Sequence, residues 1–118
     1  TEVLMACCNE NLDKLNLDWL NKKSLCIVVC SNGYPDEFKK NIKIKNLKSV
    51  NLQSQNHLFH AGTNKKDGEV YAVGGRVLNF VSLSDSFNDA KINITKNLDE
   101  LNWPGGFYRK DIGYKVVE

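Results

Sequence analysis

The segment SDSFNDAKINITKNLDEL, residues 84–101, carries the strongest secondary-structure signal in the chain. Its apolar residues recur every three or four positions, which gives a helix one continuous apolar face. These residues are Phe87, Ala90, Ile94, Leu98 and Leu101. Ser84, Asp85 and Ser86 supply side-chain oxygens that cap a helix start, and the NWPGG of residues 102–106 ends the helix. The pattern predicts a helix that packs one face against a sheet.

Residues 25–31, with the sequence LCIVVCS, predict the central strand of that sheet. They are apolar on both faces, and the NGYP turn signal of residues 32–35 ends the strand. Further strands are expected at residues 42–44, 58–63, 69–73, 76–83 and 114–117, with a short extended segment at 107–113. Residues 64–68 predict a hairpin turn, because Asp67-Gly68 favours positive φ angles. With a helix over residues 1–9, the chain predicts an α+β fold: a small, mostly antiparallel sheet with helices packed on one side.

Length and composition are those of one ordinary globular domain. The chain has 118 residues, of which 42% are hydrophobic and 25% are charged, and its formal net charge is +2. So small a charge, with basic and acidic residues interleaved, argues against a nucleic-acid partner. The longest apolar run, residues 25–30, is too short to span a bilayer, and no secretory signal is visible. We therefore expect a cytoplasmic protein with no membrane partner.

The cysteines and histidines have no spacing that suits a metal site. On one strand, Cys26 and Cys30 would lie about 13 Å apart, and His57 and His60 about 10 Å apart on opposite faces. Neither pair could bind one zinc ion without breaking its strand. The other two cysteines are neighbours on a helix, so their side chains diverge. We expect all four cysteines to be reduced, mostly buried thiols, and we expect no metal ligands.

Only two of the sixteen basic residues are arginines, and both lie in glycine-punctuated segments. Arg76 is part of VGGRVL, residues 73–78, and Arg109 is part of GGFYRKDIG, residues 105–113. Arginine binds phosphate or carboxylate through two parallel hydrogen bonds, and glycine lets the backbone approach a ligand closely. The pattern suggests a site for an anionic small molecule. The alternative is that each arginine pairs with a carboxylate and each glycine serves a turn.

Four short motifs follow one another along the chain. They are SNGYP at residues 31–35, FHAGT at 59–63, GGRVL at 74–78 and YRKDIG at 108–113, and the helix opening SDSF lies between the last two. In this order and spacing they resemble the C-terminal domain of the glycinamide ribonucleotide synthetase (phosphoribosylamine–glycine ligase) family, within the ATP-grasp superfamily. The resemblance covers nearly the whole chain. It departs at Asp36, Asn41 and Asn79, where the family usually has glycine, and at Phe38, where tyrosine is usual.

The resemblance implies an ATP-dependent carboxylate–amine ligase of purine biosynthesis. Members join glycine to phosphoribosylamine: ATP phosphorylates glycine to a glycyl phosphate, which the amine then attacks. ATP and Mg²⁺ (or Mn²⁺) would bind to upstream ATP-grasp domains, the expected partners, so this chain alone would bind no cofactor and be inactive. Residues 1–23 would be a helix and connection leading out of that core, and residues 24–118 the C-terminal substrate-side domain. We expect a monomer.

The resemblance also assigns roles to the residues around the two arginines. Arg76 would grip the ribose phosphate, while Gly74 and Gly75 allow close backbone approach; the alternative for Arg76 is a carboxylate on the upstream domains. Arg109 and Asp111 would lie on one face of an extended segment. There they either contact substrate or, as we favour, form an ion pair that pins the C-terminus. No residue of this chain is assigned a catalytic role.

His60 and the aromatic residues bear on the remaining alternatives. His60 either lines the substrate cleft or is a hydrogen-bonded histidine of the sheet. Besides a ligase domain, the chain could be a stand-alone module that binds a phosphorylated metabolite or RNA, or a purely structural domain. Only three of the eleven aromatic residues, Trp103, Phe107 and Tyr108, lie near Arg109 in the sequence, which argues against RNA recognition.

Overall fold

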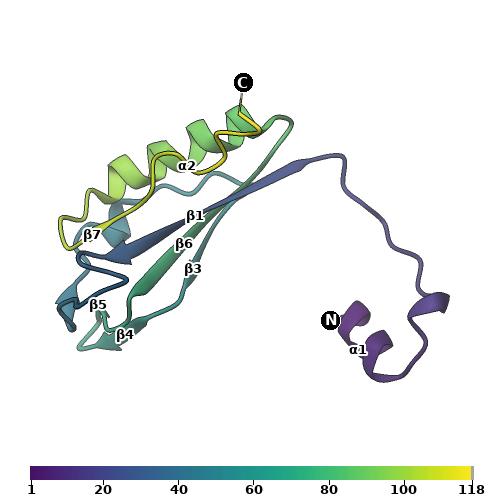
Figure 1. Cartoon of the computed structure of the whole chain (residues 1–118), viewed down its shortest axis with the longest axis horizontal. Coiled ribbons are helices and arrows are strands. Elements are labelled where there is room, and N and C mark those ends of the chain that lie inside the picture. Colours follow the sequence, from purple (N-terminus) through teal and green to yellow (C-terminus); the bar gives the residue numbers. More distant parts are fainter. Residues whose placement is uncertain (118) are drawn as a thin grey trace.

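The computed structural model describes residues 1–117, in which a long helix lies along one of two antiparallel sheets (Figure 1). The elements in chain order are α1 (Glu2–Cys8), η1 (Leu12–Lys14), β1 (Lys23–Ser31), β2 (Ile42–Lys43), η2 (Leu47–Ser49), β3 (Asn56–His60), β4 (Thr63–Lys66), β5 (Glu69–Ala72), β6 (Arg76–Ser84), α2 (Phe87–Leu101) and β7 (Gly106–Phe107). The larger sheet has the order β3-β6-β1-β7 and the smaller sheet β2-β5-β4. The α+β fold class is confirmed. Glu118, the last residue of the expected substrate-side domain, lies outside the described residues.

The helix predicted from residues 84–101 is confirmed as α2. Its N-cap is Ser86, whose hydroxyl oxygen accepts a 3.0 Å hydrogen bond from the Asp89 backbone N–H. Such a cap stabilises a helix by about 1 kcal/mol because it satisfies an N–H that has no partner inside the helix. The helix ends where Asn102 adopts left-handed φ and ψ angles, a conformation that asparagine tolerates.

Alternation along β1 and from Leu78 to Ser84 of β6 decides which face of the larger sheet α2 covers. Ile27 and Phe80 are paired across the two strands, and each is 1% exposed beneath the apolar stripe of α2. The opposite face carries the residues in between, and Figure 1 shows no helix against it. We call this side the open face; its positions are Cys26 and Val28 on β1, Asn79, Val81 and Leu83 on β6, and His57 and Phe59 on β3. All seven are at least partly exposed.

A polar seam crosses the interface between α2 and the sheet. Asn97 is 2% exposed, yet both ends of its amide are hydrogen-bonded: Nδ2 donates to the Asn51 carbonyl (3.2 Å) and Oδ1 accepts from Asn56 Nδ2 (3.4 Å). Nearby, Asn93 donates to the Ser84 hydroxyl. The sequence pattern missed this seam because helical periodicity counts only apolar residues.

The hairpin turn at Asp67-Gly68 is confirmed, with φ angles of 50° and 77°. The strand before the turn lies closer to it than expected, since β4 (Thr63–Lys66) occupies most of the segment predicted as turn, whereas β5 begins at Glu69 as expected. The first strand of this region, β3, correspondingly ends at His60 rather than at residue 63.

The C-terminal segment is folded differently from our expectation. Only β7 is a strand, and residues 110–116 form successive turns, so the extended segment at 107–113 and the edge strand at 114–117 were wrong predictions. The reason is local: Gly113 has a φ angle of 80°, and its carbonyl accepts hydrogen bonds from the N–H groups of Val116 and Val117. This curled backbone cannot extend along β1.

The expected burial of the cysteines is also wrong. All four are free thiols, but Cys7, Cys8 and Cys26 are exposed and Cys30 is half-buried. The first two are exposed because α1 buries a single residue, Ala6. Cys26 is exposed because it lies on the open face. Among residues 1–117, no helix combines the length and apolarity required to cross a membrane.

Candidate functional site

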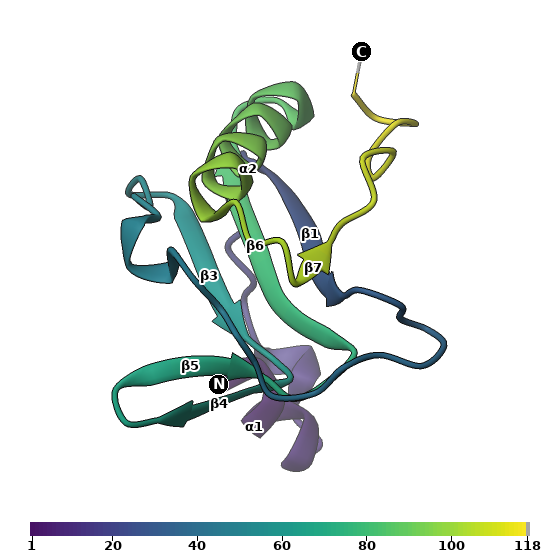
Figure 2. The ribbon, with the colours of Figure 1, turned by 90° about the vertical axis from the view of Figure 1, so that its left-hand side faces the viewer.

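One end of the larger sheet brings the four motifs close together. Arg76, the first residue of β6, is paired with Cys30 near the end of β1, and Cys30 is paired in turn with Phe107 of β7. On the other side of β6, the Gly62 N–H donates a 2.9 Å hydrogen bond to the Arg76 carbonyl. Figure 2 shows these strand ends meeting near the smaller sheet. Residues that are far apart in the sequence therefore share one edge of the fold.

Arg76 is exposed at this edge and has no carboxylate partner among the described residues. The ion pairs within residues 1–117 are Lys22–Asp85, Lys43–Glu69 and Arg109–Asp111. Its guanidinium does influence Cys30: burial raises the pKa of that thiol, and the positive charge of Arg76 partly offsets the rise. Arg76 is thus a free bidentate donor beside a strand end.

The glycines beside Arg76 are explained by contacts within the chain. A Cβ on Gly75 would overlap the ring of Tyr34, and a Cβ on Gly74 would come within 2.9 Å of the Gly62 Cα. Conversely, a Cβ on Gly62 would lie 2.6 Å from the Arg76 carbonyl oxygen. Gly62 and Gly74 let two segments pack backbone to backbone, and Gly75 leaves room for the Tyr34 ring. These contacts position the segment that leads into Arg76.

Arg109 and Asp111 form the ion pair that the sequence favoured. Arg109 Nε donates to Asp111 Oδ1 at 3.0 Å, and Nη2 donates to Oδ2. This bidentate hydrogen bonding lowers the pKa of the Asp111 carboxyl and raises that of the guanidinium. Both side chains are largely exposed and only two residues apart, so the pair joins neighbours rather than elements. The segment is instead held by Tyr108 and Ile112, which pack against the core.

His60 ends β3 on the same edge of the sheet. Its Nδ1 lies 3.0 Å from the Thr63 hydroxyl, within hydrogen-bonding distance, and the side chain is exposed. This local hydrogen bond is what we expect if His60 is a hydrogen-bonded histidine of the sheet rather than a residue that lines a substrate cleft.

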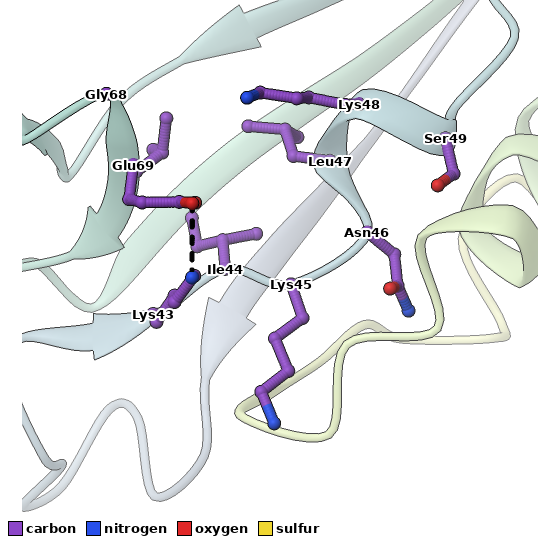
Figure 3. Close-up of a pocket in the computed structure, with 10 residues that line it drawn as sticks. Lys43, Ile44, Lys45, Asn46, Leu47, Lys48, Ser49, Gly68 and Glu69 are labelled. Carbon is purple, nitrogen blue, oxygen red and sulfur yellow. Dashed lines mark ion pairs between the residues drawn. The ribbon is translucent and has the colours of Figure 1, made fainter.

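Two of the surface hollows in this half of the molecule flank β2, and neither is lined by Arg76. One of about 380 Å³ lies between η2 and the start of β5 and is bordered by Lys45, Lys48 and the Lys43–Glu69 ion pair, whose Nζ and Oε1 atoms are 3.2 Å apart (Figure 3). The other, of about 550 Å³, lies next to the first motif. Its lining residues are Asn32, Glu37, Phe38, Lys39, Ile42 and Gly105. The first hollow has exposed lysines but no buried polar group to orient a ligand.

A metal site has no support in the part of the chain that the structure describes. Among residues 1–117, no three side chains of histidine, cysteine, aspartate or glutamate lie close enough to bind one ion. The donor set therefore does not fit Mg²⁺, which prefers several carboxylate oxygens or waters.

Comparison with solved structures identifies the class of fold, which this chain shares with one part of a larger enzyme. The chain superposes on part of phosphoribosylamine–glycine ligase from Thermotoga maritima with a TM-score of 0.68 and 24% sequence identity. The match covers 94% of this chain and 27% of that one. It shows that the two proteins share this fold.

Sequence comparison identifies the family. The model of the family described as "Phosphoribosylglycinamide synthetase, C domain" matches residues 24–115. The chain therefore belongs to this family, which confirms the resemblance carried by the four motifs.

Individual relatives agree with this assignment. Phosphoribosylamine–glycine ligase from Caldanaerobacter subterraneus is 37% identical over 111 residues, covering 94% of this chain and 26% of the relative. The Brucella melitensis ligase is 38% identical over 96% of this chain and 26% of its own length. The chloroplastic ligase of Arabidopsis thaliana is 36% identical over 98% of this chain and 22% of its own length. The chain thus spans about a quarter of the length of these relatives.

Proposed function

We propose that this chain is the substrate-side domain of a phosphoribosylamine–glycine ligase in purine biosynthesis. In that reaction the carboxylate of glycine takes the γ-phosphoryl group of ATP to give glycyl phosphate and ADP. The amine of phosphoribosylamine then forms a bond to the acyl carbon, the bond to phosphate breaks, and the amine loses a proton. Membership of the C-domain family supports this proposal, and so does the ligase fold.

Arg76 is our candidate for binding the 5-phosphate of phosphoribosylamine. The observation that carries this assignment is an exposed guanidinium that has no carboxylate partner within residues 1–117, at the edge where the motifs meet. Arginine matches two phosphate oxygens with two parallel N–H groups, which a lysine cannot do. Arg109 is a weaker candidate because its donors already bind Asp111. His60 is also a weaker candidate, because its Nδ1 already lies within hydrogen-bonding distance of the Thr63 hydroxyl.

The proposal leaves the phosphoryl-transfer chemistry to the remainder of the ligase. ATP and Mg²⁺ (or Mn²⁺) would bind there, and this chain would bind and orient phosphoribosylamine opposite the activated glycine. We further expect the ligase to act in the cytoplasm as a monomer.

The test is Arg76→Lys in the complete ligase polypeptide. Loss of one bidentate hydrogen bond to a charged group costs about 1.5–3 kcal/mol, so we expect kcat/KM for phosphoribosylamine to fall about ten- to hundredfold. The KM for ATP should change by less than about twofold, because ATP binds elsewhere.

Arg109→Lys is the matched control, since it makes the same change on the same edge. We expect it to affect phosphoribosylamine much less than Arg76→Lys does. An equal loss for ATP and phosphoribosylamine in Arg76→Lys would indicate a structural role. A larger loss in Arg109→Lys would move the phosphate site to that arginine.

A further inference from the structure

The segment that leads into Arg76 has little rigidity of its own. Gly74 and Gly75 lie between β5 and β6 and directly precede the arginine. Glycine has more backbone freedom than any other residue, so a glycine pair alone leaves the next side chain without a fixed direction. A guanidinium that binds phosphate through two parallel hydrogen bonds needs such a direction, because both bonds depend on it. Contacts from other segments must therefore hold this one.

β6 is also irregular immediately after Arg76. In the ladder with β1, Leu78 is paired with Val29. Arg76 is paired with Cys30, the next residue of β1, so Val77 is left as an extra residue. Val77 and Leu78 are both 0% exposed, although successive residues of a regular strand face opposite sides. Such a bulge redirects the side chain beside it, so the direction of Arg76 depends on how the strand is held there.

Ser31, the last residue of β1, holds the carbonyls of both glycines. Its backbone N–H donates to the Gly75 carbonyl and its hydroxyl donates to the Gly74 carbonyl, each at 2.8 Å. The residue is 2% exposed, so water cannot readily replace the hydrogen bond of the hydroxyl. On the other side of β6, the Gly62 N–H holds the Arg76 carbonyl. The carbonyls of residues 74, 75 and 76 are therefore all fixed by neighbouring segments.

We infer that Ser31 is a positioning residue for phosphoribosylamine: its hydroxyl fixes the Gly74 carbonyl and thereby the direction in which Arg76 presents its guanidinium. This inference rests on the proposed function, in which Arg76 binds the 5-phosphate. Ser31 is buried and acts only through the arginine. A substitution removes the hydroxyl bond and keeps the backbone bond, so it loosens the segment before Arg76 without detaching it from β1.

The test is Ser31→Ala in the complete ligase polypeptide. We expect kcat/KM for phosphoribosylamine to fall about three- to tenfold, because a loosened guanidinium matches two phosphate oxygens less often. The KM for ATP should change by less than about twofold, because ATP binds elsewhere. An unchanged kcat/KM for phosphoribosylamine would overturn the inference. An equal loss for both substrates would also overturn it, since Ser31 would then support the fold in general.

Ser82→Ala is the matched control, because it removes another buried hydroxyl from the same sheet. Ser82 is 0% exposed, and its hydroxyl lies 3.2 Å from that of Ser84, at the opposite end of β6 from Arg76. We expect kcat/KM for phosphoribosylamine to stay within about twofold of the wild-type value. A loss as large as that of Ser31→Ala would contradict a role specific to Ser31.

The double variant Ser31→Ala/Arg76→Lys separates this inference from the proposed function. If Ser31 acts through Arg76, Ser31→Ala should add less than about twofold to the loss caused by Arg76→Lys, because lysine has no planar donor group to orient. Losses that multiply in full would overturn the inference and leave Arg76 as the phosphate ligand. If Arg76→Lys alone has no effect on phosphoribosylamine, the proposed phosphate site is wrong, and the role of Ser31 is refuted with it.

Discussion

Gly75 shows how one missing side chain positions the candidate arginine. The ring of Tyr34, which belongs to the first motif, occupies the space in which a Cβ of residue 75 would lie. Gly75→Ala should therefore force the ring or the backbone to move, at a cost of about 1–3 kcal/mol, the usual range for overpacking. Urea unfolding of residues 1–118, followed by circular dichroism, measures this loss of stability.

A double-mutant cycle separates this clash from other effects of the substitution. In a Tyr34→Ser background the ring is gone, so Gly75→Ala should cost much less than it does in the wild-type protein. An identical cost in both backgrounds would mean that the ring contact is not the cause.

Asn41 illustrates a departure from the family pattern that the backbone tolerates. The family resemblance led us to expect glycine there, and the structure gives Asn41 a φ angle of 59°. Glycine adopts this left-handed region freely, and asparagine does so more readily than other residues with a side chain. The family pattern led to the expectation of glycine at this position, and the backbone angle explains why asparagine is an acceptable replacement.

At the scale of elements, α2 depends on Asn97 as well as on its apolar stripe. Asn97→Ala removes the donor to the Asn51 carbonyl and the acceptor for Asn56, and leaves the buried Asn56 amide and the part-buried Asn51 carbonyl without that partner. We expect a loss of about 1–3 kcal/mol in the free energy of unfolding, the cost of unsatisfied buried polar groups. Asn88→Ala is the matched control on the exposed side of the same helix and should change stability by less than about 0.5 kcal/mol. Equal effects of the two substitutions would contradict a structural role for the seam.

The elements that could be predicted are those whose residues interact locally. The stripe and cap of α2 and the Asp67-Gly68 turn are set by neighbours in the sequence, and the structure confirms both. The curled C-terminal segment could not be predicted, because its alternating residues suit a strand and only Gly113 signals the turns. The exposure of Cys26 was also mispredicted, since an apolar strand is buried on both sides only where both sides are covered within the same chain.

For the candidate site, the sequence indicated the segments that meet at one edge of the sheet but not their arrangement. The order of the four motifs predicted the family, and the register of β1 with β6 and β7 then brings them to one edge. The difference between the arginines is a property of folded geometry: Arg109 reaches Asp111, whereas Arg76 reaches no carboxylate within residues 1–117. Which of two arginines is free to bind a phosphate cannot be read from spacing alone.

At the scale of the whole molecule, the chain consists of a packed unit that begins at β1 and a preceding segment that contributes little to it. In that segment α1 buries only Ala6, and the connection leaves Trp19 87% exposed. Deletion of residues 1–21 keeps Lys22 and its 2.7 Å ion pair with Asp85. We therefore expect this deletion to change the free energy of unfolding by less than about 0.5 kcal/mol.

Removal of the C-terminal end of the chain should lower the free energy of unfolding more than removal of the N-terminal segment does. Deletion of residues 108–118 removes Tyr108 and Ile112, which are half-buried against the core, and uncovers Leu25. At about 1 kcal/mol for each partly buried side chain, this truncation should destabilise the domain by about 2 kcal/mol. Urea unfolding of the two truncated proteins beside residues 1–118 gives both values. If deletion of residues 1–21 costs as much as deletion of residues 108–118, the division near residue 23 is wrong, and the preceding segment is part of the domain's own core.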